Sequence, residues 1–295
     1  HALSRWLEAP ATMSADLNIS RRPVPSIFDW FADWGALAIT SICTLGDFAL
    51  FTMRTFSWLL ARWPRTETLL INFYQIGVLS LPVVALTGTF IGMVLAVQSY
   101  YQFHTIGLES RLGSVINMTL LRELGPVLAA TMLAGRVGSA MAAELGTMRV
   151  TEQIDAFEAM GANPIHYLVV PRLIACVVLI PMLTVMADLF GVLGGYFYSD
   201  TMLQIDRHYY WQNSQQFVGS WDFIYGLIKS VFFGATIALV SCYRGFNSAA
   251  GAEGVGRAAT ASFVNSFCVI LALDLTVGIF LDNLYSALFL GGPQL

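Results

Sequence analysis

Charged residues are scarce in this chain. Asp, Glu, Lys and Arg make up 12% of its 295 residues, and 56% of the residues are hydrophobic, whereas soluble domains carry about 25% charged residues. The net charge is only -4, and lysines and arginines form no run, so the charge pattern gives no reason to expect a nucleic-acid partner. The composition predicts an integral membrane protein.

Catalytic and metal-binding motifs are missing as well. There is no GxxxxGK[ST] loop for nucleotide phosphates, and the nearest glycine-rich string, GAEGVGR at 251–257, lacks the lysine and its spacing. HExxH, GxSxG and histidine clusters are absent too. Cysteines without CxxC or Cys/His spacing are expected to be apolar core residues, and the chain has four of these: Cys43, Cys176, Cys242 and Cys268. We expect no catalytic residue, no metal site and no cofactor bound by this chain.

What the chain has instead is a series of long apolar segments. A bilayer core needs about 20 apolar residues, and five segments meet this length, at about 70–103, 112–146, 166–199, 222–244 and 258–287. The first contains Gly88 and Gly92 in a GxxxG pattern, which permits close helix packing or arises by chance in a glycine-rich chain. We predict an all-α integral membrane protein with five transmembrane helices.

The segment before these spans has a mixed character. Residues 34–53 are nearly apolar but contain Asp47, and tryptophans, which prefer the headgroup level, flank them. We predict an N-terminal interfacial helix at 31–62, with a sixth span as the alternative. Residues 1–30 form an unassigned N-terminal extension with no apolar run of the signal-peptide kind.

The distribution of arginines predicts the orientation. With five spans, one side of the membrane collects most of them: Arg21, Arg22, Arg54, Arg62, Arg65, Arg149, Arg172, Arg244 and Arg257. The other side collects only Arg111 and Arg207 in its loops. The arginine-rich side should be cytoplasmic. The aromatic loop at 200–220 should then face outward, as a re-entrant or interfacial segment or as an ordinary loop in the aromatic belt.

Two features carry charge where a simple membrane protein would have none. Arg122 and Glu123 lie inside the second span, where insertion scales give a cost of about 2.5–3.5 kcal/mol for a charge such as Arg. They either line a polar cavity on a substrate path or form a structural ion pair with Arg136 or Asp188.

The second feature is a charge-dense island between the second and third spans, with Glu144, Arg149, Glu152, Asp155, Glu158 and Arg172. It predicts a cytoplasmic helix held by another protein, or else a solvated helix face.

These residues also carry a resemblance. The string LLRELGPVLAATMLAGRVGSAMAAELGTMRVTEQIDAFEAMG at 120–161, with further strings at 77–100, 227–241 and 254–264, resembles the MlaE (YrbE) family. Members are permease subunits of ABC transporters that move phospholipids or related lipids in cell envelopes. The resemblance covers about 45–285, and we place a permease domain of this type at 31–290.

The resemblance implies partners and a location. It implies a homodimer in the bacterial inner membrane, a cytoplasmic pair of ABC ATPases that hold ATP and Mg²⁺, and a periplasmic MCE-domain (MlaD-like) protein. A small STAS-domain (MlaB-like) subunit often accompanies them. Phospholipid is the expected cargo class, although family members carry different lipids.

The resemblance also implies roles for particular residues. The island at 147–161 is similar to a coupling helix: DAFEAMG at 155–161 has the D/E-A-x-x-x-x-G outline, but it departs downstream, where nine residues separate Gly161 from Pro171. The expected ATPase contacts are Arg149, Glu152, Gln153, Asp155 and Ala156. The expected lining of the lipid cavity is Leu95, Gln98, Phe103, Arg122 and Glu123.

Two other functions remain as alternatives. An ion-driven secondary transporter would use Glu123 and Asp188 as proton carriers, and such transporters usually contain inverted repeats, of which this chain shows none. A non-transporting membrane scaffold would have no need for Arg122 and Glu123 inside a span.

Overall fold

The computed structural model describes residues 27–61, 64, 66–105, 107, 111–205 and 207–289. These residues form helices and short connections, with no strand among them. They divide into two units, one up to Leu50 and one from Phe51 onward, so that the boundary falls inside α1 (Ile27–Ala61). Residues 1–26 of the expected N-terminal extension lie outside the described residues.

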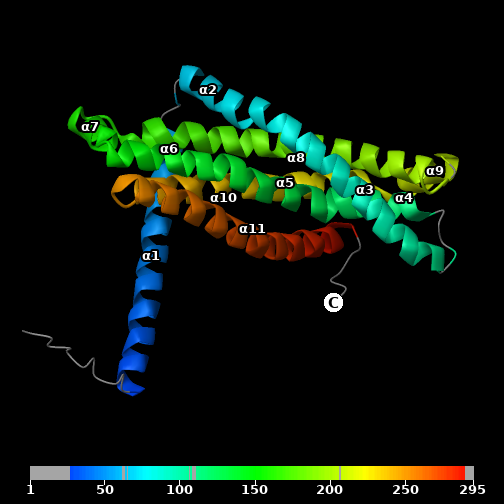
Figure 1. Ribbon diagram of the computed structural model, residues 1–295, viewed down its shortest axis with the longest axis horizontal. Helices are drawn as coiled ribbons and strands as arrows, with labels where there is room; N and C mark the ends of the chain where they lie inside the picture. Colours follow the sequence, from blue (N-terminus) through cyan, green and yellow to red (C-terminus); the bar gives the residue numbers. More distant parts are fainter. Residues whose placement is uncertain are drawn as a thin grey trace, which may run out of the picture. The chain divides into compact units, whose positions relative to one another are not determined.

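The second unit is a bundle of helices in which successive spans lie side by side (Figure 1). Its elements in chain order are α2 (Thr66–Ile76), a 3-10 turn (Val78–Ser80), α3 (Leu81–Thr105), α4 (Leu112–Thr119), a π turn (Leu120–Leu124), α5 (Gly125–Leu133), a second π turn (Ala134–Gly138), α6 (Ser139–Val150), α7 (Gln153–Ala159), a third π turn (Ile165–Val169), α8 (Val170–Thr201), α9 (Arg207–Phe217), α10 (Ser220–Phe246) and α11 (Gly251–Phe289). The short helices α7 and α9 lie at opposite ends of this bundle (Figure 1).

Five helical stretches are long and apolar enough to cross a membrane, which confirms the expected number of spans. They are Thr66–Thr105, Leu112–Val150, Ile165–Thr201, Ser220–Phe246 and Gly251–Leu288. Each is somewhat longer than the apolar segment expected from the sequence. The helix α1 is not among the five, and its interfacial placement stays a prediction.

The closest helix packing joins α3 to α8. A Cβ added at Gly88 would lie 2.5 Å from the carbonyl oxygen of Ala187, and one added at Gly92 would overlap the carbonyl oxygen of Gly191. Only glycine permits backbones to approach this closely, as in small-residue interfaces of membrane helices. The GxxxG pattern is therefore a packing motif of this fold, and the reading that it permits close approach is confirmed.

Replacing Gly92 with alanine is expected to destabilise the folded protein by about 1–3 kcal/mol, the usual cost of forcing an extra methyl group into a packed core. Thermal unfolding in detergent measures this change. The matched control is Gly256→Ala on α11, where an added Cβ meets no atom within 4 Å. Equal melting temperatures for the two variants would contradict the close α3–α8 contact.

The second span is not a regular α-helix. Two π turns interrupt it, at Leu120–Leu124 and Ala134–Gly138. Pro126 follows the first and has no N–H to donate, so the carbonyl group of Arg122 lacks its usual helical partner. Single-turn π segments are frequent at functional sites. Here they contain the charged residues of the span: Arg122, Glu123 and Arg136.

Candidate functional site

The charged island folds into a short separate helix after a sharp break. The span ends with α6 at Val150, and Glu152 then adopts a left-handed backbone conformation with φ +58°. The helix α7 covers Gln153–Ala159, and Gly161 terminates it with φ +74°. The sequence placed one helix at about 147–161, whereas in the structure residues 147–150 continue α6.

The inner face of α7 is anchored in the bundle. Ile154 is 2% exposed and packs in a cluster with Leu145, Leu168, Val169 and Cys242. Phe157, one turn later, stacks on Tyr167 with ring centroids 6.2 Å apart. Residues at i and i+3 share one face of a helix, so these two side chains fix the rotation of α7.

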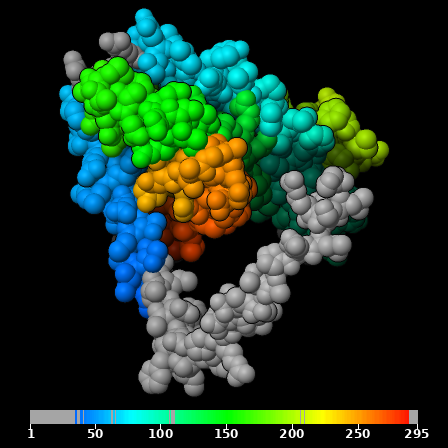
Figure 2. Space-filling view, turned by 60° about the vertical axis from the view of Figure 1, so that its left-hand side comes forward, coloured from blue at the N-terminus to red at the C-terminus, as the bar shows by residue number. Residues whose placement is uncertain are grey.

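The outer face of α7 carries the residues expected to contact an ATPase. Glu152, Gln153, Asp155 and Ala156 are all exposed. Arg149, at the end of α6, forms an ion pair with Asp155 across the break. On the side of the molecule seen in Figure 2, the green surface of α6 and α7 is uncovered. The structure thus brings the five expected contact residues to one exposed corner.

Two charges of the island have a different role. Arg172, 7% exposed, lies 3.0 Å from a carboxylate oxygen of Glu144 and donates to the carbonyl oxygen of Leu168 at 2.7 Å. This pair joins α6 to the beginning of α8. The side chain of Arg172 is buried in the bundle, whereas that of Glu144 is 51% exposed. The pair therefore stabilises the island from inside the bundle.

Arg122 lies at the centre of a polar network inside the membrane-spanning part. Its guanidinium group is 2.6 Å from a carboxylate oxygen of Asp282 and 3.5 Å from one of Asp222. It also lies over the ring of Tyr225, 4.6 Å from the centroid. The Tyr225 hydroxyl donates to the carbonyl oxygen of Gly278 at 3.2 Å. The second span is thereby joined to α10 and α11.

Lys229 forms the second half of this network. Its ammonium group is buried, with the side chain 1% exposed, and lies 2.7 Å from Glu123 and 2.8 Å from Asp274. The same ammonium is 4.8 Å from the centroid of the Tyr225 ring. Two cations and four carboxylates therefore meet around one tyrosine. Such short charge-assisted contacts offset the cost of placing ions in a membrane.

The ion-pair partners considered from the sequence for Arg122 and Glu123 are wrong. Arg136 donates instead to the hydroxyl of Ser80. Asp188 packs against Gly125, and its Oδ1 atom has no hydrogen-bond partner in the ranges that the structure describes. A signal in the sequence existed only for the pair of Lys229 with Asp274, because these are isolated opposite charges in successive spans and such ions usually pair.

The expected cavity residues separate into two groups. Leu95 and Phe103 of α3 pack around a cluster of Ala96, Leu112 and Ile116, and Gln98 is exposed on the same helix. Arg122 is partly exposed and Glu123 is 47% exposed on its side chain. The apolar and the charged groups thus lie in different clusters of the chain, and their shared role in binding lipid stays a prediction.

The loop at 200–220 contains the helix α9, which packs on α4. Asn117 donates to the hydroxyl of Ser214 at 3.0 Å, and Tyr210 donates to Asn117 at 3.4 Å. Burial raises the pKa of the Tyr210 hydroxyl above its ordinary value. The Arg207 guanidinium group donates two hydrogen bonds of 2.7 Å to the carboxylate of Asp200. These contacts give the loop a fixed structure at the end of the bundle opposite α7 (Figure 1).

Most of the second unit matches a known protein family. The model of the MlaE permease family matches residues 69–280. The chain belongs to the MlaE permease family. This match contains the second span with its two π turns, α7 and the segments of α10 and α11 that hold Lys229 and Asp274.

Individual relatives cover most of the chain. A Rickettsia conorii protein named a probable ABC transporter permease is 45% identical over 229 residues, which are 77% of this chain and 88% of that protein. The Haemophilus influenzae permease named MlaE, of an intermembrane phospholipid transport system, is 36% identical over 204 residues, 69% of this chain and 78% of its own length. A chloroplast protein of Arabidopsis thaliana, named Protein Trigalactosyldiacylglycerol 1, is 39% identical over 204 residues, 69% of this chain and 58% of its own length.

Proposed function

We propose that this chain is the permease subunit of an ABC transporter that moves phospholipid between the bacterial inner membrane and an MCE-protein channel. A separate ATPase subunit, which holds ATP and Mg²⁺, supplies the energy. Family membership supports the permease role, and the name of the Haemophilus relative, a permease of an intermembrane phospholipid transport system, supports phospholipid as the cargo class. The observation that carries the proposal is α7, a short helix with an anchored inner face and an exposed polar outer face.

The anchoring of α7 suggests how force reaches the spans. When ATP binding closes two ATPase subunits, the partner pushes on the outer face around Glu152 and Asp155. Ile154 and Phe157 transmit this displacement to the start of α8, and the ion pair of Arg149 with Asp155 transmits it to α6. Because α6 continues the second span, the movement reaches Arg122 and Glu123.

The substrate path in this proposal lies at the interface of two copies of the chain. Leu95 and Phe103 supply apolar wall for acyl chains, while Gln98, Arg122 and Glu123 supply polar groups for a headgroup, the combination expected of a lipid pocket. An MCE-domain protein receives or delivers lipid on the periplasmic side, and a STAS-domain subunit joins on the cytoplasmic side. The ion-driven alternative is less well supported, because Glu123 is engaged by Lys229 at 2.7 Å.

The test is reconstitution of the chain with its co-purified ATPase in vesicles that contain a fluorescent phospholipid. We expect lipid transfer to an MCE-domain acceptor that requires ATP and stops when the ATPase carries a catalytic-site mutation. Transfer without ATP that follows the membrane potential would overturn the proposal in favour of an ion-driven transporter. Failure to recover any ATPase with the chain from native membranes would also count against it.

A further inference from the structure

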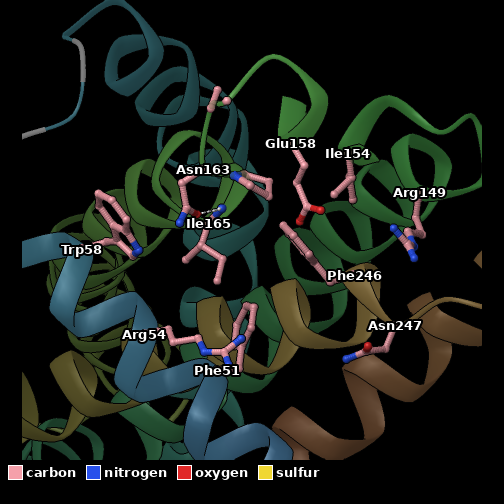
Figure 3. A pocket seen from close by; sticks show the side chains of 13 residues that line it. Phe51, Arg54, Trp58, Arg149, Ile154, Glu158, Asn163, Ile165, Phe246 and Asn247 are labelled. Carbon is pink, nitrogen blue, oxygen red and sulfur yellow. Dashed lines mark hydrogen bonds between the residues drawn. The ribbon is translucent and has the colours of Figure 1, made fainter. Parts of the chain in front are cut away.

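A second site lies beside α7, on the same end of the bundle. An open pocket of about 880 Å³ is lined by the 51–58 segment of α1, by α7 with the turn at 161–165, and by the end of α10. Figure 3 shows Arg54 and Trp58 on the α1 side, Glu158 on the α7 side, and Phe246 between them. All of these residues belong to the second unit. None of the residues of the polar network around Tyr225 lines this pocket.

The pocket lies where lipid headgroups would be. The helix α10 has 27 residues, a length of about 40 Å, against about 30 Å for the hydrocarbon core of a bilayer. Its last residue, Phe246, therefore lies at headgroup level. On the other side of the pocket, the ring centroids of Trp58 and His166 are 5.7 Å apart, and His166 lies in the first turn of the third span. Tryptophan side chains prefer the headgroup level of a bilayer.

The pocket presents one cation and one anion that are not joined to each other. Arg149 also lines it, but Asp155 neutralises that guanidinium group. Within the described ranges, the ion pairs include neither Arg54 nor Glu158, and both side chains are exposed. A purely anionic ligand would be attracted by Arg54 but repelled by Glu158, so the charges favour a zwitterion.

The polar groups between these charges suit a phosphate. The Asn163 carbonyl oxygen is occupied, since it accepts from the backbone N–H of Ile165 at 2.9 Å. Among the residues that the structure describes, no acceptor is found for the N–H groups of the Asn163 side chain, which lies at the pocket wall (Figure 3). Guanidinium and amide donors bind phosphate oxygens, and a carboxylate accepts from a primary ammonium.

We infer that this pocket binds the headgroup of an ethanolamine phospholipid from the cytoplasmic leaflet, with the phosphate on Arg54 and Asn163 and the ammonium on Glu158. The orientation rests on the proposed function, which places this end of the bundle in the cytoplasm. The bound lipid would join the 51–58 segment of α1 to α7. This bound lipid would stay beside α7 and would be distinct from the lipid that is transported.

The experiment uses the full chain with its ATPase, in vesicles of phosphatidylglycerol that contain a trace of a photoreactive ethanolamine phospholipid. Labelled peptides are identified by mass spectrometry. We expect labelling of peptides that contain residues 51–58 and 161–165. Arg54→Gln and Glu158→Gln should each reduce it about tenfold, the effect of losing one charge-assisted hydrogen bond.

Matched controls have the same charge changes outside the pocket. Arg257 and Glu253 are exposed residues at the start of α11, 70% and 84% exposed on their side chains, and Arg257→Gln and Glu253→Gln should label like the wild type. Unchanged labelling in Arg54→Gln, or equal labelling of these peptides by photoreactive phosphatidylglycerol, would overturn the inference. Soluble glycerophosphoethanolamine at high concentration carries the same phosphate and ammonium groups and should reduce the labelling. A failure to compete would also overturn the inference, because the headgroup would then not be what the pocket recognises.

ATP-driven transfer is measured in the same vesicles, so the two proposals fail separately. Loss of pocket labelling with intact ATP-dependent transfer would refute the headgroup site and leave the transporter. Pocket labelling without any ATP-dependent transfer would support the headgroup site and refute the transporter.

Discussion

Replacing Lys229 with methionine is expected to destabilise the folded protein by about 3 kcal/mol and to abolish transport. Removing one partner of a buried ion pair typically costs about 3–5 kcal/mol, because the remaining charge is left unpaired. The lower end applies here, since Glu123 is 47% exposed and is partly solvated. Without the ammonium group, Glu123 and Asp274 would face each other in the membrane-spanning part. Thermal unfolding in detergent and ATP-dependent lipid transfer measure the two effects.

A double variant separates stability from transport. In Lys229→Met/Asp274→Leu the stranded carboxylate at position 274 is removed together with the cation. We expect the unfolding temperature to recover at least halfway, because an apolar pair of similar volume often replaces a buried ion pair without loss. Transport should stay absent if the charges have a role beyond folding. Full transport in the double variant would show that the network is structural only.

The second large effect is expected at α7. Charge reversal by Glu152→Lys or Asp155→Lys should abolish ATP-driven transport and weaken recovery of the ATPase, while the unfolding temperature of the permease itself changes little. The reason is that both side chains are exposed, whereas the anchoring residues Ile154 and Phe157 are untouched. Co-purification of the ATPase with each variant, and transfer in vesicles, are the measurements.

Two controls make this test specific. Glu253→Lys reverses an exposed charge on α11 and should leave both ATPase recovery and transport unchanged. Glu152→Asn tests the backbone, because asparagine tolerates the left-handed conformation better than most residues and Glu152 has φ +58°. If Glu152→Asn binds the ATPase normally while Glu152→Lys does not, charge is the cause. Normal ATPase recovery in both charge-reversal variants would refute the coupling role of α7.

The spans could be predicted from the sequence because a bilayer imposes a simple requirement on length and polarity. The pairing of charges could not, since it depends on how each helix is rotated about its axis. Asp222 and Asp282 lie 100 and 160 residues after Arg122, and nothing in their local sequence identifies them as its partners. Arg136 has favourable spacing on the same helix, but a π turn redirects it to Ser80.

The break in the helix at Glu152, before α7, could not be predicted from the sequence either. A left-handed residue between two helices is usually glycine, and the chain has Glu152 there, inside a string of good helix formers. A continuous helix at 147–161 is the natural expectation from such residues. Burial of Ile154 against Leu145 and Leu168 draws the chain back toward the bundle. Tertiary packing thus overrides the local preference for a continuous helix.

The glycine contact between α3 and α8 has a consequence for comparing different states of the transporter. At Gly88, Gly92 and Gly191 the backbones of the two helices meet directly, so no long side chain lies between them at these positions to repack. They cannot move closer, and they lose contact at once if they move apart. The pair should therefore keep one geometry through the transport cycle. It provides the frame of reference on which the displacements of α7, α10 and α11 can be measured.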